Sequence, residues 1–302
     1  MIQAEKPEQV LPTAVASLGK PKQEGRPSQA ISTNNWLIYT LLTLGLIIMI
    51  VPFVWMILSS LKGPAELAHL PPTWLPTAPT LINYSNLFTQ LNFPVYFLNS
   101  VILAVSITVL NLLFCSMLGY AIAKMKFRGK NVLFLLVLAT FMIPSAVTLV
   151  PLFVLMSNLG LVNNLLAVIL PESAAGIGVF LMRQFMVGIP DELLDAGRVD
   201  GAGEFYLFWR VVLPLCGPAL GTLTILTFLA SWNDFTWPLI VLTSDQKYNL
   251  PVALATFAVG PHVNDNGLLL AGAVVLAMPI LIVFFLLQRY FTQGIVMSGL
   301  KG

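Results

Sequence analysis

The stretch from Ile189 to Leu220 has the sequence IPDELLDAGRVDGAGEFYLFWRVVLPLCGPAL. It is too polar to cross a bilayer as a helix, because charged groups are costly at the centre of a membrane. It also holds too many apolar side chains for a solvated loop. These are Leu193, Leu194, Val199, Phe205, Phe208, Trp209 and Val212. We therefore expect a folded segment that presents an apolar face.

Local signals predict two short helices joined by a bend. Pro190–Glu192 is typical of a helix start, because the acidic groups lie near the positive end of the helix dipole. Asp200–Gly201 is a turn signal. Gly203–Glu204 can open a second helix that runs towards Pro214. On this pattern alone, an amphipathic segment lying on the inner leaflet is an equally good interpretation.

The composition of the whole chain indicates a membrane protein. Of 302 residues, 57% are hydrophobic and only 9% are charged, and the mean hydropathy is +0.87. A soluble domain carries about 25% charged residues, so lipid must face much of this surface. The net charge of +2 is too small to indicate a nucleic-acid partner. Two distant cysteines and two histidines form no disulfide framework and no metal-binding spacing, and we expect the cysteines to be buried thiols.

Six stretches reach the length of about 20 apolar residues that a spanning helix needs. They are residues 36–60, 97–123, 131–155, 164–187, 216–242 and 268–290. The second, third and sixth are clear candidates. Pro52 and Pro171 predict kinks in the first and fourth, and such kinks require neighbouring helices that bind the freed carbonyl groups. Trp232–Asp234 interrupts the fifth.

Basic residues set the expected orientation, since loops on the cytoplasmic side are enriched in Lys and Arg. With the N-terminus in the cytoplasm, thirteen of the 15 basic residues lie inside, and only Lys62 and Lys247 lie outside. The fold class is therefore an all-α membrane protein with six transmembrane helices and both termini cytoplasmic. The outside loop 61–96 is either an interfacial segment or a docking surface for an external partner.

The chain divides into three parts. Residues 1–35 hold four prolines among polar residues and no continuous apolar run, which predicts a flexible cytoplasmic tail rather than a cleaved signal peptide. Residues 36–292 form the six-helix permease domain, with the polar segment 189–215 inside it. Residues 293–302 form a cytoplasmic C-terminal tail.

The polar segment resembles a known motif. Asp195-Ala196-Gly197, then Asp200-Gly201-Ala202 and Leu213-Pro214, are similar to the "EAA" motif of ABC importer permeases. That motif is Glu-Ala-Ala-x-x-x-Gly, followed at a fixed distance by a hydrophobic residue, x, Leu-Pro. Asp195 replaces Glu and keeps its charge. Gly197 replaces the second Ala, which costs about 1 kcal/mol in a helix and predicts a less rigid turn.

The resemblance implies the fold of a type I ABC importer permease, in which residues 189–215 form the cytoplasmic coupling loop. The residues that it assigns to ATPase coupling are Asp195, Ala196, Gly197, Asp200, Gly201, Ala202, Leu213 and Pro214. Asp195 or Asp200 either pairs with a basic residue of the ATPase or caps a local turn. The implied partners are an ABC ATPase dimer, a second homologous permease subunit and a periplasmic or lipid-anchored solute-binding protein. The chain itself holds no cofactor, because ATP and Mg are bound by the ATPase, and its location is the bacterial inner membrane.

Three further stretches resemble the carbohydrate branch of this family, the maltose-type second permease. They are Ile169–Pro171 with Phe180–Phe185, Ser231–Leu239, and Gln288–Phe291 with the closing Gly299–Gly302. The resemblance implies import of a carbohydrate, polyol or glycoside. It also implies that residues 293–302 contact the ATPase, although an ordinary chain end is the alternative.

Polar residues within predicted spans point to a translocation path. Glu172 and Asp234 carry charges that cost about 2.5–3.5 kcal/mol at the membrane centre, so they should face a protein interior or water. Trp232 and Asn233 add a flat aromatic face and an amide, which suit a neutral sugar. We predict that these four residues line the path. A structural role for Asn233 and Asp234, bonded to a neighbouring helix, is the alternative.

Other functions fit less well. The chain lacks Gly-x-x-x-x-Gly-Lys-Ser/Thr, so it has no phosphate-binding loop for ATP. Both histidines are expected outside, and no Ser/His/Asp set lies on one side of the membrane, so we expect no enzyme activity. A stand-alone ion-coupled secondary transporter could use Glu172 and Asp234 for coupling, but it leaves the segment 189–215 unexplained.

Overall fold

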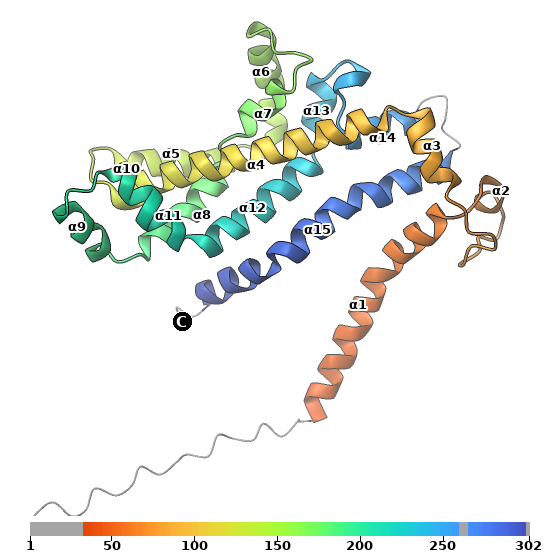
Figure 1. Cartoon of the computed structure of the whole chain (residues 1–302), viewed down its shortest axis with the longest axis horizontal. Coiled ribbons are helices and arrows are strands. Elements are labelled where there is room, and N and C mark those ends of the chain that lie inside the picture. The colour runs from red at the N-terminus through yellow and green to blue at the C-terminus, as the bar shows by residue number, and fades with distance from the viewer. Residues whose placement is uncertain (1–32, 260–264, 300–302) are drawn as a thin grey trace, which may run out of the picture. The chain divides into compact units, whose positions relative to one another are not determined.

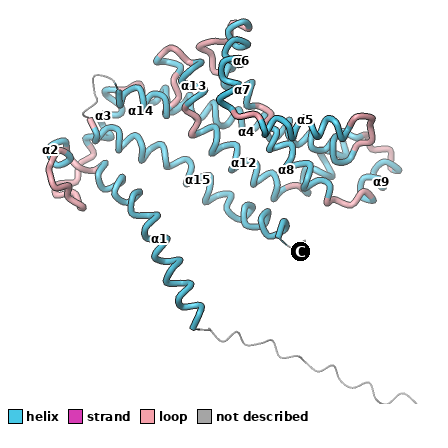
Figure 2. Tube along the Cα trace, turned by 180° about the vertical axis from the view of Figure 1, so that it is seen from behind, coloured by secondary structure: helices cyan, strands magenta, loops and turns pink. Residues whose placement is uncertain are grey.

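The computed structural model describes residues 33–259 and 265–299, and within these ranges every regular element is a helix (Figures 1 and 2). The chain divides into two compact units, residues 1–51 and 52–302. Most of the predicted tail 1–35 lies outside the described residues, as do the last three residues of the predicted tail 293–302. Side chains are described from Trp36 to Gln288, apart from residues 260–264.

The elements follow one another in a single series along the chain. They are α1 (Thr33–Ser60), α2 (Pro64–Leu67), α3 (Ile82–Gln90), α4 (Phe93–Lys124), α5 (Lys130–Met142), α6 (Ser145–Asn158), α7 (Leu166–Glu172), α8 (Gly176–Val187), α9 (Glu192–Val199), α10 (Glu204–Leu207), the π-helical turn η1 (Phe208–Val212), α11 (Leu213–Leu215), α12 (Gly217–Trp232), α13 (Thr236–Val241), the short 3₁₀ turn η2 (Asp245–Lys247), α14 (Leu250–Val259) and α15 (Asn266–Gly299).

The described residues hold four helical stretches that are long and apolar enough to cross a membrane. These are Trp36–Ser60, Phe93–Lys124, Leu166–Val187 and Asn266–Gln288. Two bent pairs, α5 with α6 and Glu204–Leu215 with α12, bring the number to six if each pair crosses once. The first four predicted stretches and the sixth therefore lie on candidate spans. The fifth, residues 216–242, is divided between the bent pair that ends at Trp232 and the short helix α13.

The third predicted span, residues 131–155, contains a bend that was not predicted. α5 and α6 meet at an angle of 103°. Ile143 and Pro144 between them are both extended, with ψ angles of 114° and 134°. Proline disfavours a helical conformation in the residue before it, so Pro144 ends α5 and starts α6 in a new direction.

The break at the end of α7 shows how a membrane helix tolerates proline. Pro171 has no N–H, so the carbonyl group of Ala167, four residues earlier, loses its partner within the helix. The buried indole of Trp237 in α13 donates to this oxygen at 2.9 Å. α7 then ends at Glu172, and α8 begins at Gly176. A neighbouring element thus binds the freed carbonyl, as predicted for this span.

The core of the second unit is built on α4, which packs along α8 and α12 (Figure 1). Glycines allow the close approach. A Cβ atom at Gly119 would lie 2.9 Å from the Cβ atom of Met182, and one at Gly178 would lie 2.8 Å from the sulfur of Cys115. Small residues at such contacts are typical of membrane helices. Cys115 and Cys216 are buried free thiols, as predicted.

Side-chain contacts bring together loops that the predicted topology places on the same side of the membrane. Lys124, at the end of α4, bonds Asp191. At the other end of α4, Tyr96 bonds Asp245. Asn163, between α6 and α7, accepts hydrogen bonds from the backbone of Thr243 and Ser244. The alternation of sides along the chain is therefore consistent with these contacts.

Candidate functional site

The segment 189–215 folds as two short helices with a bend, as predicted. α9 ends at Val199, and Gly201 follows with a φ of +82°. The amide of Ala202 donates to the carbonyl oxygen of Gly197, and the amide of Gly201 donates to that of Arg198. This is a Schellman motif, which closes a helix C-terminus and requires a left-handed residue. Nothing lies within 4 Å of a Cβ atom built at Gly201, so its backbone conformation alone favours glycine.

Gly197 has a packing role that the sequence did not reveal. A Cβ atom at this position would lie 2.5 Å from a methyl carbon of Leu207. Leu207 in α10 is buried, with 1% of its surface exposed. The departure from the Glu-Ala-Ala pattern therefore makes room for contact between α9 and α10, and does not simply loosen α9.

The loop has an inner and an outer apolar face. Leu194, Leu207, Phe208 and Val212 are buried together with residues of α4 and α8. Other large apolar side chains of the segment remain exposed, and these are Leu193, Val199, Phe205, Tyr206, Trp209 and Leu215. Phe205, Tyr206, Trp209 and Arg210 line a shallow hollow in this outer face. The segment is therefore anchored on one side and open on the other.

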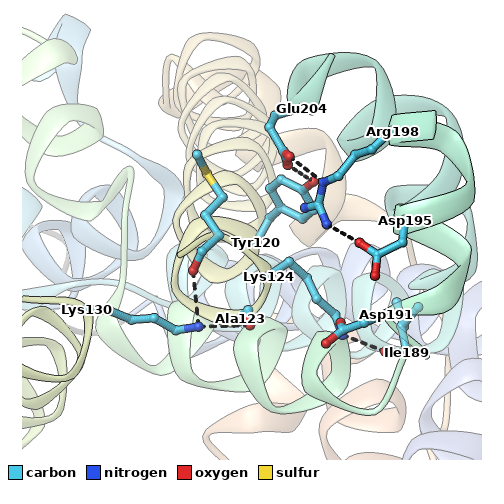
Figure 3. A network of polar contacts seen from close by, with 10 residues as sticks. Tyr120, Ala123, Lys124, Lys130, Ile189, Asp191, Asp195, Arg198 and Glu204 are labelled. Atoms are coloured by element: carbon cyan, nitrogen blue, oxygen red, sulfur yellow. Dashed lines mark hydrogen bonds and ion pairs between the residues drawn. The ribbon is translucent and has the colours of Figure 1, made fainter. Parts of the chain in front are cut away.

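A chain of charged groups connects the two helices of the loop (Figure 3). Arg198 donates from Nη1 to Asp195 at 2.8 Å and from Nε to Glu204 at 2.9 Å. Tyr120 of α4 donates its hydroxyl to the other oxygen of Glu204 at 2.5 Å. The hydrogen bonds to Glu204 and Asp195 raise the pKa of Arg198 further above its ordinary value, so its charge is constant.

A second contact ties the start of the loop to α4. The ammonium group of Lys124 donates to the carboxylate of Asp191 and to the carbonyl oxygen of Ile189, both at 2.5 Å. Only 4% of the Lys124 side chain is exposed, so these two acceptors satisfy a buried charge. The hydrogen bond from Lys124 lowers the pKa of Asp191 below its usual range. Lys130 bonds the carbonyl oxygens of Ala123 and Met125, which closes the end of α4 (Figure 3).

The eight residues predicted to couple to the ATPase do not all share one surface. Asp195, Ala196 and Asp200 are exposed on α9 and at its end. Gly197, Gly201 and Ala202 shape the contact between the helices and the turn. Leu213 packs partly into the core, and Pro214 lies in α11 where the chain turns by 81° into α12. The last two therefore belong to the bend rather than to the exposed face.

Two helix breaks meet within the apolar part of the second unit. Glu172 ends α7, and Asp234 lies in the polar break, Asn233–Phe235, between α12 and α13. The two carboxyl groups interact with each other. Asn111 of α4 donates to the carbonyl oxygen of Glu172 at 3.0 Å, and Asn249 donates to that of Asp234 at 2.8 Å. One oxygen of Asp234 is buried and has no hydrogen-bond partner.

The side chain of Trp232 is enclosed by neighbouring helices. Its side chain is 1% exposed, and its indole donates to the carbonyl oxygen of Leu276 in α15 at 2.9 Å. Phe228 stacks on one face and Phe97 approaches edge-on. Trp232 therefore has no free aromatic face for a sugar. Asn233 is exposed, but its amide donates to the carbonyl oxygen of Leu229 within α12.

The sequence reasoning missed the polar residues of α4. Tyr96, Asn99 and Ser100 at its start, and Tyr120 near its end, all bond other elements. The available signal was Asn99, with Asn111, in an otherwise apolar span, since polar groups in membrane helices need partners. In the loop 61–96, Lys62 is also buried, where it donates to the carbonyl oxygen of Thr73 and lies over the Trp55 ring.

Comparisons with known proteins agree on one class of transport protein. The family described as "Binding-protein-dependent transport system inner membrane component" matches residues 115–297. The arabinooligosaccharides transport system permease protein AraQ of Halalkalibacterium halodurans is 44% identical, over 87% of this chain and 96% of its own length. The lactose transport system permease protein LacG of Rhizobium radiobacter is 31% identical, over 86% and 94%.

A further relative and a solved structure extend the comparison. The sn-glycerol-3-phosphate transport system permease protein UgpE of Yersinia pestis is 30% identical, over 86% of this chain and 95% of its own. The crystal structure of a bacterial ABC transporter that imports the acidic polysaccharide alginate has a chain with the same fold. Its TM-score is 0.79 at 24% identity, with 87% of this chain and 98% of that chain covered.

Proposed function

We propose a sugar-import role for this chain, which belongs to the family of inner membrane components of binding-protein-dependent transport systems. It is a non-catalytic permease subunit of an ABC importer, and it is a multi-pass protein of the inner membrane. Its complex includes an ATPase, where ATP and Mg are handled, and a solute-binding protein. We further propose that the ATPase is a dimer and that a second, homologous permease encloses the path with this chain.

The proposed cargo is a neutral oligosaccharide. The 44% identity to an arabinooligosaccharide permease supports this class more strongly than the lower identities to lactose and glycerol phosphate permeases. An anionic cargo would favour basic groups along the path. Lys62, one of two basic residues expected outside, is instead buried against Thr73 and Trp55. Binding assays on the solute-binding protein with arabinose, lactose and chitobiose oligomers test the class.

The proposed topology has six spans, with both termini in the cytoplasm. The excess of basic residues in the loops expected inside supports it, together with the pairing of loops on each side of α4. Residues 1–35 and 293–302 are the proposed cytoplasmic tails around the permease domain 36–292. α15 continues as a helix to Gly299, so most of the second tail extends the last span towards the ATPase.

The coupling loop, residues 189–215, is the proposed docking site for the ATPase. One observation carries this proposal: the loop buries one apolar face in its own subunit and leaves another exposed, with Val199 at 88% exposure at the tip of α9. An apolar side chain so exposed next to Asp195 and Asp200 fits a protein cleft with an apolar floor and a basic rim. Lipid contact at the inner leaflet is the alternative occupant of this face.

Co-purification of the complex tests the docking. Val199→Asp leaves the inner face untouched, so the permease should fold, but it should lower the amount of native ATPase recovered with it about tenfold or more. Leu81→Asp is the matched control, since Leu81 is exposed outside the loop. Full recovery of the ATPase with Val199→Asp would refute the docking.

The translocation path is proposed to pass the polar break at Glu172 and Asp234, with exposed Asn233 beside it. A buried oxygen of Asp234 lacks a hydrogen-bond partner, which supports a polar ligand at this break, while Trp232 only supports the break from behind. Asp234→Asn keeps a hydrogen-bonding group of the same size. It should raise the KM for the loaded receptor and leave the amount of co-purified ATPase unchanged. Unchanged uptake with Asp234→Leu would exclude a role in the path.

The carboxyl pair at two helix breaks also favours a second candidate, an ion-coupled transporter working alone. The two mechanisms differ in their energy source. Proteoliposomes that hold the chain with its partners should take up sugar only with internal ATP, and a proton gradient should not replace it. Uptake by the chain alone, driven by a gradient, would favour the second candidate.

A further inference from the structure

α4 connects the coupling loop with the opposite side of the membrane. It is one continuous helix of 32 residues, and at 1.5 Å per residue it is about 48 Å long. The loop elements α9 to α11 lie at one end of it, and α14 lies at the other (Figures 1 and 2). Like α15, it is long enough to reach both faces of the bilayer without a break. By contrast, α5–α6 and the α12 region are bent by 103° and 81°, and α7 is separated from α8.

The end of α4 holds both halves of the loop from one face. Tyr120 and Lys124 are four residues apart, so they lie on the same side of the helix. Tyr120 bonds Glu204 at the start of α10, and Lys124 bonds Asp191 and the backbone just before α9. Because Glu204 also bonds Arg198 of α9, a displacement of either helix pulls on α4.

The start of α4 makes a matching set of contacts with residues 245–250. Tyr96 donates to Asp245 at 2.7 Å, and Asn99 donates to the carbonyl oxygens of Gln246 and Tyr248. The amide of Leu250 donates to the hydroxyl of Ser100. These contacts are directional hydrogen bonds, so this end of α4 cannot slide against the segment without breaking them.

The segment 245–250 in turn reaches the polar break. Asn249 donates to the carbonyl oxygen of Asp234, which is the residue whose carboxyl group faces Glu172. Half-way along α4, Asn111 bonds the carbonyl oxygen of Glu172 itself. Both carboxyl-bearing residues are thus tied through hydrogen bonds to the same helix that holds the coupling loop.

We propose that α4 is the strut that transmits motion of the coupling loop to the polar break. In this proposal, which rests on ATPase docking at the loop, Tyr120 and Lys124 are positioning residues at the driven end. Tyr96, Asn99 and Ser100 are positioning residues at the far end, and Asn111 acts between them. Apolar packing with α8 and α12 guides the helix, while the polar contacts fix its register.

The test compares sugar transported per ATP hydrolysed by the full complex in proteoliposomes with its loaded receptor. Tyr120→Phe and Asn99→Leu should each lower this ratio about tenfold, because each removes hydrogen bonds at one end. ATPase recovery and basal ATP hydrolysis should stay unchanged. Val109→Ala, on an exposed part of α4, is the control and should keep the ratio. An unchanged ratio in both test variants would overturn the proposal.

A cross-linking rescue separates transmission from simple folding damage. Lys124→Cys with Asp191→Cys should lower the ratio, and a short bifunctional thiol reagent should restore it by reconnecting α4 to the loop. The native cysteines are buried and should not react. If the cross-link forms and the ratio stays low, Lys124 does not act as a link. If, in addition, Val199→Asp co-purifies with a normal amount of ATPase, the proposal that the ATPase docks on the loop fails as well. If Val199→Asp loses the ATPase, docking stands and only the role of α4 as a strut fails.

Discussion

The coupling loop and the polar break satisfy their polar groups in different ways. In the loop, charged side chains bond one another, as Arg198 does with Asp195 and Glu204. In the break, side chains bond main-chain oxygens, as Trp232 does with Leu276 and Asn249 with Asp234. The loop therefore keeps a rigid shape with its outer face free for a partner. In the break, most of the polar groups hold neighbouring helices together, and we propose that the carboxyl pair meets the cargo.

The largest expected effect tests whether Trp232 belongs to the structure or to the path. Trp232→Ala removes a buried indole, its stacking on Phe228 and its bond to Leu276, and should cost about 3–5 kcal/mol of stability. The thermal unfolding temperature of the purified complex should fall clearly. A variant with normal stability and a raised KM would instead return Trp232 to the path.

A smaller effect should follow from Gly201→Val in the loop. The left-handed conformation costs an ordinary residue about 1–2 kcal/mol, and a β-branched one more. The strain should displace α10 relative to α9 and lower sugar uptake per ATP. Gly203→Ala is the matched control, because Gly203 has a φ of −75° and open space around it. Equal uptake by the two variants would contradict the role given to the turn.

Gly197→Ala sets helix propensity against packing. Alanine favours a helix by about 1 kcal/mol relative to glycine, yet here its methyl group would overlap Leu207. Overpacking of this kind costs about 1–3 kcal/mol, so we expect a slightly less stable loop, measured as faster amide hydrogen exchange in α9. Slower exchange in the variant would show that Leu207 can move aside without loss of stability. Gly197 would then act by making α9 more flexible and not by making room for Leu207.

The smallest effect is a pH dependence that belongs to the loop alone. Because Lys124 lowers the pKa of Asp191, this contact stabilises the folded loop above the ordinary carboxyl pKa and loses its effect as the pH falls through the lowered value. Hydrogen exchange in α9 should therefore accelerate, beyond its intrinsic pH dependence, only in acid. Lys124→Met should remove this acid-specific acceleration, and a variant that keeps it would show that another group is responsible.

Much of the loop was predictable from the sequence, because its elements depend on local signals. Asp200–Gly201 sits at the bend, and the spacing from Asp195 to Pro214 led to the family. The packing of Leu207 onto Gly197 was not predictable, since it depends on a contact ten residues away. The partner of Trp232 in α15 was not predictable for the same reason, because it is set by tertiary packing. The contacts between α4 and the loop were also not predictable, because Tyr120 and Lys124 bond residues more than 60 positions later in the chain.

The break in the third span was within reach of the sequence. Pro144 lies in the middle of residues 131–155, and its effect on Ile143 is local. Apolar composition concealed it, because hydropathy does not distinguish a straight helix from two helices at 103°. By contrast, the partner of the carbonyl group that Pro171 frees depends on tertiary structure. That Trp237 donates to the carbonyl oxygen of Ala167 could be seen only in the folded chain.

Photo-crosslinking from position 199 tests directly whether the ATPase docks on the coupling loop. A photoreactive amino acid replaces Val199 at the tip of α9 in the full complex, and a second replaces Leu81 as a control, because both side chains are exposed. If the ATPase docks on the loop, position 199 should crosslink to the ATPase subunit and position 81 should not. Crosslinks from position 199 to lipid, with none to the ATPase, would show that the loop lies on the membrane and would contradict the account.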